Sequence, residues 1–220
     1  MTSTPSEHHA HSEHEHAQQA GGSLNSMAAS ATLHCLTGCA IGEVVGLIVG
    51  TAAGLGNAAT IVISIALAFV FGFTLSSLPL LRAGLTLGAT LSVVVAADTL
   101  SIATMEVVDN VVMWLIPGAM NAGLVNAVFW VGMMISLTVA FFGAYPVNRY
   151  LLQRGKGHAL THEYHHGAAS PTGARRFIPS IPTPTLVAVL VAFLLGGLVV
   201  SVADDLGVSG SSAPSHSSTS

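Results

Sequence analysis

The chain has few charged residues, and fewer of them are basic than acidic. Only 7% of its 220 residues are charged, and six are Lys or Arg against ten Asp or Glu. No basic cluster is large enough to neutralise a phosphate backbone, so we expect no nucleic-acid partner. Hydrophobic residues make up 51% of the chain, and the mean hydropathy is +0.70. These values are typical of an integral membrane protein in contact with the lipid bilayer.

Cysteine is equally scarce, with Cys35 and Cys39 as the only two. Thiols four residues apart on one helix do not form an extracellular disulfide framework, so a reduced or metal-bound pair is expected. Residues 1–32 have neither a basic start nor an apolar core, and therefore do not read as a secretory signal. Their content of Ser, His and Glu predicts a disordered, histidine-rich tail.

Five apolar segments are long enough to cross a hydrocarbon layer of ~30 Å, which needs about 20 helical residues. They cover residues 33–55, 57–81, 86–117, 123–150 and 183–203. The third is longer than one span needs, and we expect it to tilt, to protrude, or to break near Asp98 or Asn110.

The predicted fold is all-α, a polytopic transmembrane helical bundle with four core spans and one added C-terminal span. The four core spans occupy residues 33–152, followed by a polar, histidine-rich cytoplasmic linker at 153–182. The fifth helix covers 183–203, and a Ser-rich tail covers 204–220.

All basic residues fall on one side of the predicted spans. These residues are Arg82, Arg149, Arg154, Lys156, Arg175 and Arg176. We expect the protein to lie in the inner or plasma membrane of the cell. The positive-inside rule then places the side with the basic residues, and with it the N-terminus, in the cytoplasm.

Glycine recurs at every fourth position of the first span. The stripe consists of Gly38, Gly42, Gly46, Gly50 and Gly54. Such spacing leaves one helical face without side chains, so another helix can approach closely. We therefore expect close helix packing here and a homo-oligomer joined through glycine-lined faces.

Acidic residues lie within the apolar third span. Asp98, Glu106 and Asp109 share one helical face with the sulfur-bearing Met105 and Met113. Ionisable groups inside a membrane span indicate an ion pathway or a proton relay. The alternative is that these acids form hydrogen bonds to neighbouring spans, and that the methionines fill the core.

The first span carries a second group of polar residues. His34, Cys35, Cys39 and Glu43 lie at its start, where soft ligands and a carboxylate are suited to a metal gate at the cytoplasmic face. Alternatively, the two thiols are small packing residues beside the glycine stripe.

Histidines concentrate in the N-terminal tail and in the linker. The linker group contains His158, His162, His165 and His166. Imidazoles interleaved with Glu are typical of low-affinity metal-binding tracts, and this group is predicted to bind a metal ion. A pH-sensitive solvated tail is the other interpretation of the N-terminal tract.

Several motifs resemble those of a prokaryotic membrane family catalogued as the domain of unknown function 4396, over roughly residues 33–166. They lie at 34–43, 79–84, 96–110, 116–120, 144–151 and 154–166. The resemblance implies a four-helix integral membrane domain that is sometimes found in copper-related contexts. It brings no assigned site residues.

The residues favour passage or sensing of a transition-metal cation, with copper before zinc or nickel. In this interpretation the intramembrane carboxylates exchange protons, and a cytoplasmic protein donates or accepts the metal. The alternative is a subunit for membrane assembly or scaffolding that transports nothing. No nucleophile with a base and an orienting group is visible, so we do not expect an enzyme.

Overall fold

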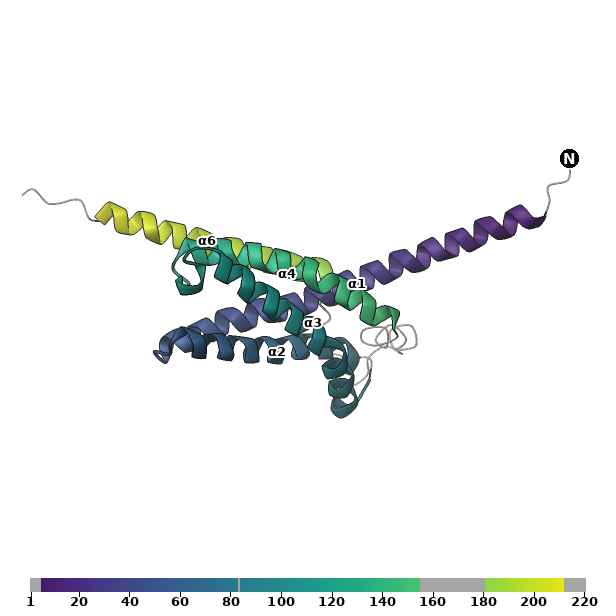
Figure 1. Cartoon of the computed structure of the whole chain (residues 1–220), viewed down its shortest axis with the longest axis horizontal. Coiled ribbons are helices and arrows are strands. Elements are labelled where there is room, and N and C mark those ends of the chain that lie inside the picture. Colours follow the sequence, from purple (N-terminus) through teal and green to yellow (C-terminus); the bar gives the residue numbers. More distant parts are fainter. Residues whose placement is uncertain (1–4, 83, 155–180, 212–220) are drawn as a thin grey trace, which may run out of the picture.

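The structure is a computed structural model that describes residues 5–82, 84–154 and 181–211. Its long elements are all helices (Figure 1). They are α1 (Pro5–Ala52), α2 (Asn57–Arg82), α3 (Leu87–Leu115), α4 (Ala127–Gln153) and α6 (Thr183–Ser211), with a short 3-10 helix η1 (Ala119–Asn121) between α3 and α4. No strand occurs in these ranges, so the predicted all-α helical bundle is confirmed.

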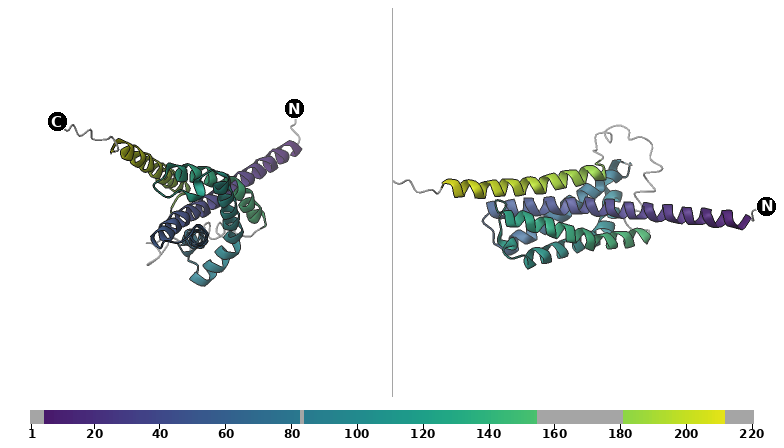
Figure 2. Two further views of the ribbon diagram at one scale, coloured as in Figure 1. Left: turned by 60° about the vertical axis from the view of Figure 1, so that its left-hand side comes forward. Right: turned by 90° about the horizontal axis from the view of Figure 1, so that it is seen from above.

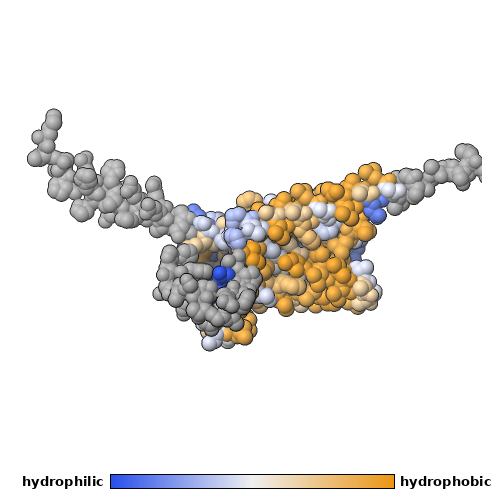
Figure 3. All heavy atoms as spheres, turned by 180° about the vertical axis from the view of Figure 1, so that it is seen from behind, coloured by the Kyte–Doolittle hydropathy of each residue, from blue (hydrophilic) through white to orange (hydrophobic). Residues whose placement is uncertain are grey.

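Four helices contain stretches long and apolar enough to cross a membrane. These stretches are Leu24–Ala52, Asn57–Arg82, Ala127–Gln153 and Thr183–Gly207. The helix α3 qualifies as a fifth span when its two segments are taken together, and they meet at an angle of 48° between Ala96 and Asp98. A break near Asp98 was one of the outcomes that the sequence left open. Figure 3 shows the broad apolar surface of the bundle, as expected for a multi-pass membrane protein.

The first helix begins much earlier than the sequence composition suggested. A disordered tail was expected over residues 1–32, whereas α1 is helical from Pro5 and its apolar stretch begins at Leu24. Proline is well suited to the first position of a helix, and the Ala, Glu and Gln residues that follow have high helix propensity. The N-terminal part of α1 leaves the bundle as a single helix (Figure 1).

The glycine stripe of α1 packs against α2 of the same chain. A Cβ atom added at Gly38 would lie 2.5 Å from the Cα of Gly72, and one added at Gly46 would lie 2.5 Å from the Cα of Ser64. Gly42 faces Ala68 in the same way. Each step of four residues along α1 meets a step of four backwards along α2, which confirms an antiparallel hairpin with close backbone contact. The stripe from Gly38 to Gly46 is therefore covered within the chain, not by a second copy.

The hairpin reverses direction at a tight turn. The N–H of Leu55 donates to the carbonyl of Gly50 at 2.9 Å, and Gly54 adopts a φ of +65°. Glycine suits this left-handed conformation, which ends the helix and satisfies its last carbonyl groups. Gly54, the last glycine of the predicted stripe, therefore forms the turn after α1.

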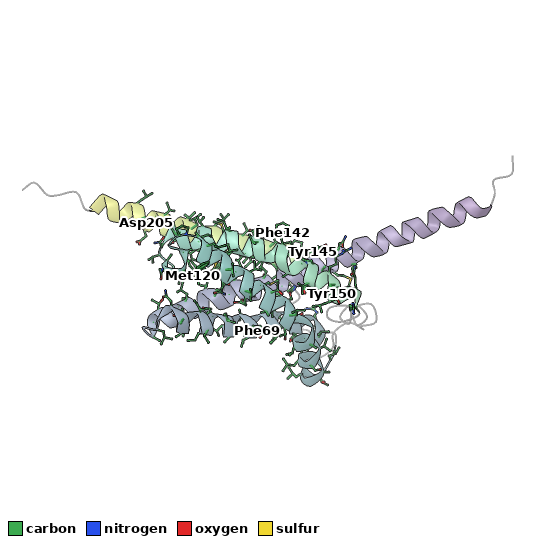
Figure 4. All side chains as sticks on the ribbon, in the orientation of Figure 1. Phe69, Met120, Phe142, Tyr145, Tyr150 and Asp205 are labelled. Atoms are coloured by element: carbon green, nitrogen blue, oxygen red, sulfur yellow. The ribbon has the colours of Figure 1, made fainter. Side chains whose placement is uncertain are left out.

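Helix α1 is the central element, because it contacts α2, α3, α4 and α6. Arg149 Nε donates to Asn25 Oδ1 at 2.9 Å and so joins the end of α4 to the beginning of the α1 span. Figure 2 shows α1 and α6 leaving the bundle at opposite ends. In Figure 4, Tyr150 lies at the end of α4, far from Asp205 on α6. The chain therefore has one end rich in basic residues, and its opposite end carries Asp204 and Asp205.

Helix α6 docks on α4 through an aromatic contact. The indole of Trp130 lies over Gly197, where an added Cβ would be 2.5 Å from Trp130 Cδ2, and it packs edge-on against Phe193. Trp130 Nε1 donates to the Leu124 carbonyl at 2.7 Å, and Ser201 Oγ donates to the same carbonyl at 3.0 Å. Glycine at 197 is thus needed for the fifth span to reach the core.

Replacing Gly197 by leucine is expected to release α6 from α4, because the new side chain would occupy the position of the indole. The matched control is Gly196→Leu, since nothing lies within 4 Å of a Cβ at Gly196. Overpacking of this kind costs about 1–3 kcal/mol. Thermal unfolding in detergent should show a lower Tm for Gly197→Leu only. Equal Tm values for the two variants would show that α6 is held elsewhere.

Candidate intramembrane cation pathway

The polar residues of α1 and α3 meet in pairs inside the bundle. Along α1, Cys35, Cys39 and Glu43 lie four residues apart, and each interacts with a different acid of α3. The pairs are Cys35 with Asp98, Cys39 with Glu106, and Glu43 with Asp109. We call this arrangement the α1–α3 seam. Eight residues separate the first and third pairs on α1, which corresponds to ~12 Å along the helix axis.

The first pair is surrounded by hydroxyl groups. The Cys35 thiol is fully buried, and the carboxyl group of Asp98 is near enough to act on it electrostatically. The hydroxyls of Ser76 on α2 and Ser101 on α3 are both directed at this thiol. Asp98 lies directly after the bend of α3, so the first pair lies next to this bend.

The second pair joins a thiol to a buried carboxyl group. Cys39 interacts with Glu106, and both side chains are buried. Both carboxyl oxygens of Glu106 are buried without a hydrogen-bond partner of ordinary geometry. A weak S–H donor is therefore a polar neighbour of an acid whose desolvation is costly.

The third pair consists of two carboxyl groups in hydrogen-bonding contact. Glu43 and Asp109 interact in this way, and Ser136 of α4 lies beside Asp109. Ionised carboxylates only accept hydrogen bonds, so one of the two groups must carry a proton when they bond to each other. Glu43 Oε1 and Asp109 Oδ1 remain buried without a partner. This pair can hold one proton between α1 and α3.

One end of the seam is closed by a buried contact between α1 and α4. Asn148 Nδ2 donates to Thr32 Oγ1 at 2.8 Å, and Thr32 Oγ1 donates to the Ala28 carbonyl at 2.7 Å. Both side chains are buried. Thr32 precedes Cys35 by one helical turn, so this contact lies between the first pair and the basic end of the bundle.

Two hydroxyls beside the first pair, those of Ser76 and Ser101, differ from most other hydroxyls in the spans. Thr37, Ser77 and Thr138 donate to carbonyls four residues back, at 2.8, 2.6 and 2.6 Å. Such back-bonding is the usual solution in a membrane helix. Ser76 and Ser101 are 1% and 0% exposed, yet neither hydroxyl oxygen has a partner of ordinary geometry. These two hydroxyls can therefore still form hydrogen bonds to a ligand bound between the helices.

The predicted gate residues do not come together as one site. His34 Nδ1 forms a 2.8 Å hydrogen bond with the Ser30 carbonyl of its own helix, whereas the two thiols face different acids of α3. Within the described ranges, no group of three or more His, Cys, Asp or Glu side chains is arranged to hold a metal ion. The four-residue gate expected from the sequence is therefore replaced by successive pairs.

The methionines predicted to line the pathway lie in the core. Met105 and Met113 are 1% and 7% exposed and belong to the buried hydrophobic cluster. The sulfur of Met113 would be 3.0 Å from a Cβ at Gly132 of α4, so it fills the space beside that glycine. The linker histidines His158, His162, His165 and His166 lie outside the described residues.

Polar residues on α2 and α4 complete the seam, and the sequence did not single them out as site residues. They are Ser76, Ser136 and Asn148, with Thr32 on α1. Small polar residues are frequent in membrane helices, and most bond to their own backbone. Only the packing of α1, α2 and α4 shows which ones face the seam.

The chemistry of the seam is that of a chain of exchangeable sites. Thiols and carboxyls can each lose a proton and accept a cation, and successive pairs interact: Cys35 of the first pair with Cys39 of the second, and Cys39 with Glu43 of the third. Weak adjacent sites are what conduction through a membrane requires. Burying an acid in a membrane span is costly, and such residues therefore commonly mark ion or proton pathways.

Comparison with known proteins places this seam in a family domain. The family described as domain of unknown function 4396 matches residues 24–157, which is more than half of the chain. The match contains α1 from its apolar part, α2, α3 and α4, and therefore every member of the three pairs. Helix α6 lies outside it. No curated protein and no solved structure matches the chain.

Proposed function

Because the chain belongs to the family of domain of unknown function 4396, whose description gives no activity, we propose a function from the seam itself: passage of a transition-metal cation through the membrane in exchange for protons. The observation that carries this proposal is the pairing of α1 with α3. Cys35, Cys39 and Glu43 each have their own acid on α3, in order along both helices.

The burial of these acids supports a path more than a structural role. Asp98, Glu106 and Asp109 are 1%, 4% and 5% exposed. If the acids served only to join helices, their oxygens would be paired with donors on neighbouring spans. Instead, both Glu106 oxygens and one Asp109 oxygen are buried without a hydrogen-bond partner of ordinary geometry, and the polar neighbours of these acids include a weak thiol donor and a second acid. A moving cation or proton would satisfy them in turn.

The remaining polar elements have subsidiary roles in this proposal. The histidines of the N-terminal tract and the linker collect the ion, or receive it from a cytoplasmic metal donor. The Thr32–Asn148 contact, with its 2.8 Å hydrogen bond, restricts entry from that end. Copper, zinc and nickel are the candidate ions, and the role is transport without catalysis.

Flux into proteoliposomes tests the proposal. The purified full chain, reconstituted with a pH gradient, should move at least one of Cu(I), Zn²⁺ and Ni²⁺, measured by elemental analysis of the liposomes. Protein-free liposomes are the control. Absence of flux for all three ions in both gradient directions would contradict transport and favour the assembly or scaffold role.

The orientation of the chain is a separate prediction. We propose that the basic end of the bundle is cytoplasmic, because Arg82, Arg149 and Arg154 end helices α2 and α4 and cytoplasmic loops are rich in Arg and Lys. Reporter fusions at residues 20 and 165 should be cytoplasmic, and a fusion at residue 220 should be external. External reporters at either of the first two positions would overturn this orientation.

A further inference from the structure

The strongest unassigned feature is the space around Cys35. Polar groups from α2 and α3 surround this thiol of α1: the Ser76 hydroxyl of α2 and the Ser101 hydroxyl of α3 lie within hydrogen-bonding reach of it, and the Asp98 carboxyl of α3 is near enough to act on it electrostatically. All four side chains are at most 1% exposed. The two hydroxyls point toward the thiol and lack a partner of ordinary geometry.

We propose that Cys35 and Asp98, assisted by the hydroxyls of Ser76 and Ser101, form a transit site for a divalent cation of the zinc class. The inference rests on the proposed function, and it names the kind of ion that the seam carries.

The charge of the site selects a divalent ion. A metal ion binds cysteine as the thiolate and aspartate as the carboxylate, so the protons of Cys35 and Asp98 are both released when the metal enters, one divalent ion for two protons. Thiolate and carboxylate together carry two negative charges, and a divalent cation leaves the occupied site neutral. A neutral complex is favoured in the low-dielectric interior of a membrane. A monovalent Cu(I) ion would leave one negative charge uncompensated.

The donor set also selects the ion. One thiolate and one carboxylate suit Zn²⁺ and related borderline ions, which take four ligands. The Ser76 and Ser101 hydroxyls bring the number of ligands to four without adding charge, either by binding the ion directly or through water. With only two ionised ligands the site binds weakly, which matches a site that must release its ion to the next pair.

Cadmium is the probe for this site, because a Cd²⁺–thiolate bond gives a charge-transfer band in the ultraviolet. The full-length Cys39→Ala variant in detergent keeps Cys35 as its only thiol. Titration with CdCl₂ should produce the thiolate band with one equivalent of Cd²⁺ per chain, and Zn²⁺ should displace it. Cu(I), supplied as a buffered complex, should bind less tightly than Zn²⁺.

Second substitutions in the Cys39→Ala protein test the other donors. Ser76→Ala and Ser101→Ala should each weaken Cd²⁺ binding by about tenfold, the usual effect of removing a supporting group, and Asp98→Asn should weaken it further. Ser77→Ala is the matched control, because its hydroxyl bonds to the Phe73 carbonyl at 2.6 Å. It should bind Cd²⁺ as the Cys39→Ala protein does. Each variant must elute from a sizing column as the Cys39→Ala protein does.

Failure of this inference can be told apart from failure of the proposed function. The transit site would be overturned if the Cys39→Ala protein gave no thiolate band. It would also be overturned if adding Asp98→Asn to that protein left Cd²⁺ binding unchanged. Either result would count even if the wild-type protein moves metal. Tighter binding of Cu(I) than of Zn²⁺ would overturn its divalent selectivity. Conversely, a band that depends on Asp98 in a protein without flux would retain the site and remove the transport proposal.

Discussion

Replacing Asp109 by asparagine is expected to reduce metal flux by at least about tenfold while the protein remains folded. Asparagine has nearly the same shape as aspartate and can still bond to Ser136 and Glu43, so packing between α3, α4 and α1 should survive. It has no exchangeable carboxyl proton and no negative charge. Loss of about 1.4 kcal/mol of cation stabilisation already gives a tenfold reduction, and we expect at least about that.

Flux of the same ion into proteoliposomes measures this effect, with reconstituted protein quantified in each sample. Asp98→Asn, at the first pair, should give a similar loss. Asp204→Asn is the matched control, since Asp204 is exposed on α6 beyond the seam. Wild-type flux for both Asp98→Asn and Asp109→Asn would show that the acids have a structural role only.

Replacing Gly46 by leucine should separate α1 from α2 and sharply reduce the yield of folded protein. A Cβ at Gly46 would lie 2.5 Å from the Cα of Ser64, which is backbone and cannot rotate away. The two helices must then move apart along the hairpin, and the loss of packing adds to the usual overpacking cost of about 1–3 kcal/mol.

The measurement is Tm and monodisperse yield in detergent. Gly88→Leu is the matched control, because nothing lies within 4 Å of a Cβ at that helical glycine. If Gly46→Leu changes the oligomeric state but not the stability of the monomer, the stripe serves contact between copies, as the sequence first suggested. Equal Tm values for both variants would show that α2 does not cover Gly46.

The sequence predicted the helices and their order well, because hydropathy and length determine membrane spans directly. It also placed Asp98, Glu106 and Asp109 on one face, since helical periodicity alone determines this. A break of the third span near Asp98 was one of several outcomes, and packing against α1 and α2 was needed to distinguish them. The glycine spacing predicted close packing, but it carries no information on whether the partner lies in the same chain.

The site itself was only partly predictable. Cys35 and Cys39 share a helical face, which suggested one joint metal gate, yet the crossing of α1 and α3 gives each thiol a different acid. Ser76 and Ser101 resemble many back-bonded hydroxyls in membrane helices, and their orientation depends on tertiary contacts. The helix from Pro5 was missed because polar composition indicates disorder even where helix propensity is high.

The most direct test of the central claim is simultaneous recording of metal and proton movement through the reconstituted protein. Liposomes containing a trapped pH indicator receive the transported ion outside, and their metal content is determined over the same interval. Our account predicts that protons leave the liposomes as metal enters, and that both movements fall by at least about tenfold in Asp109→Asn. Metal entry without proton movement, or with proton movement unchanged in Asp109→Asn, would contradict exchange along the α1–α3 seam.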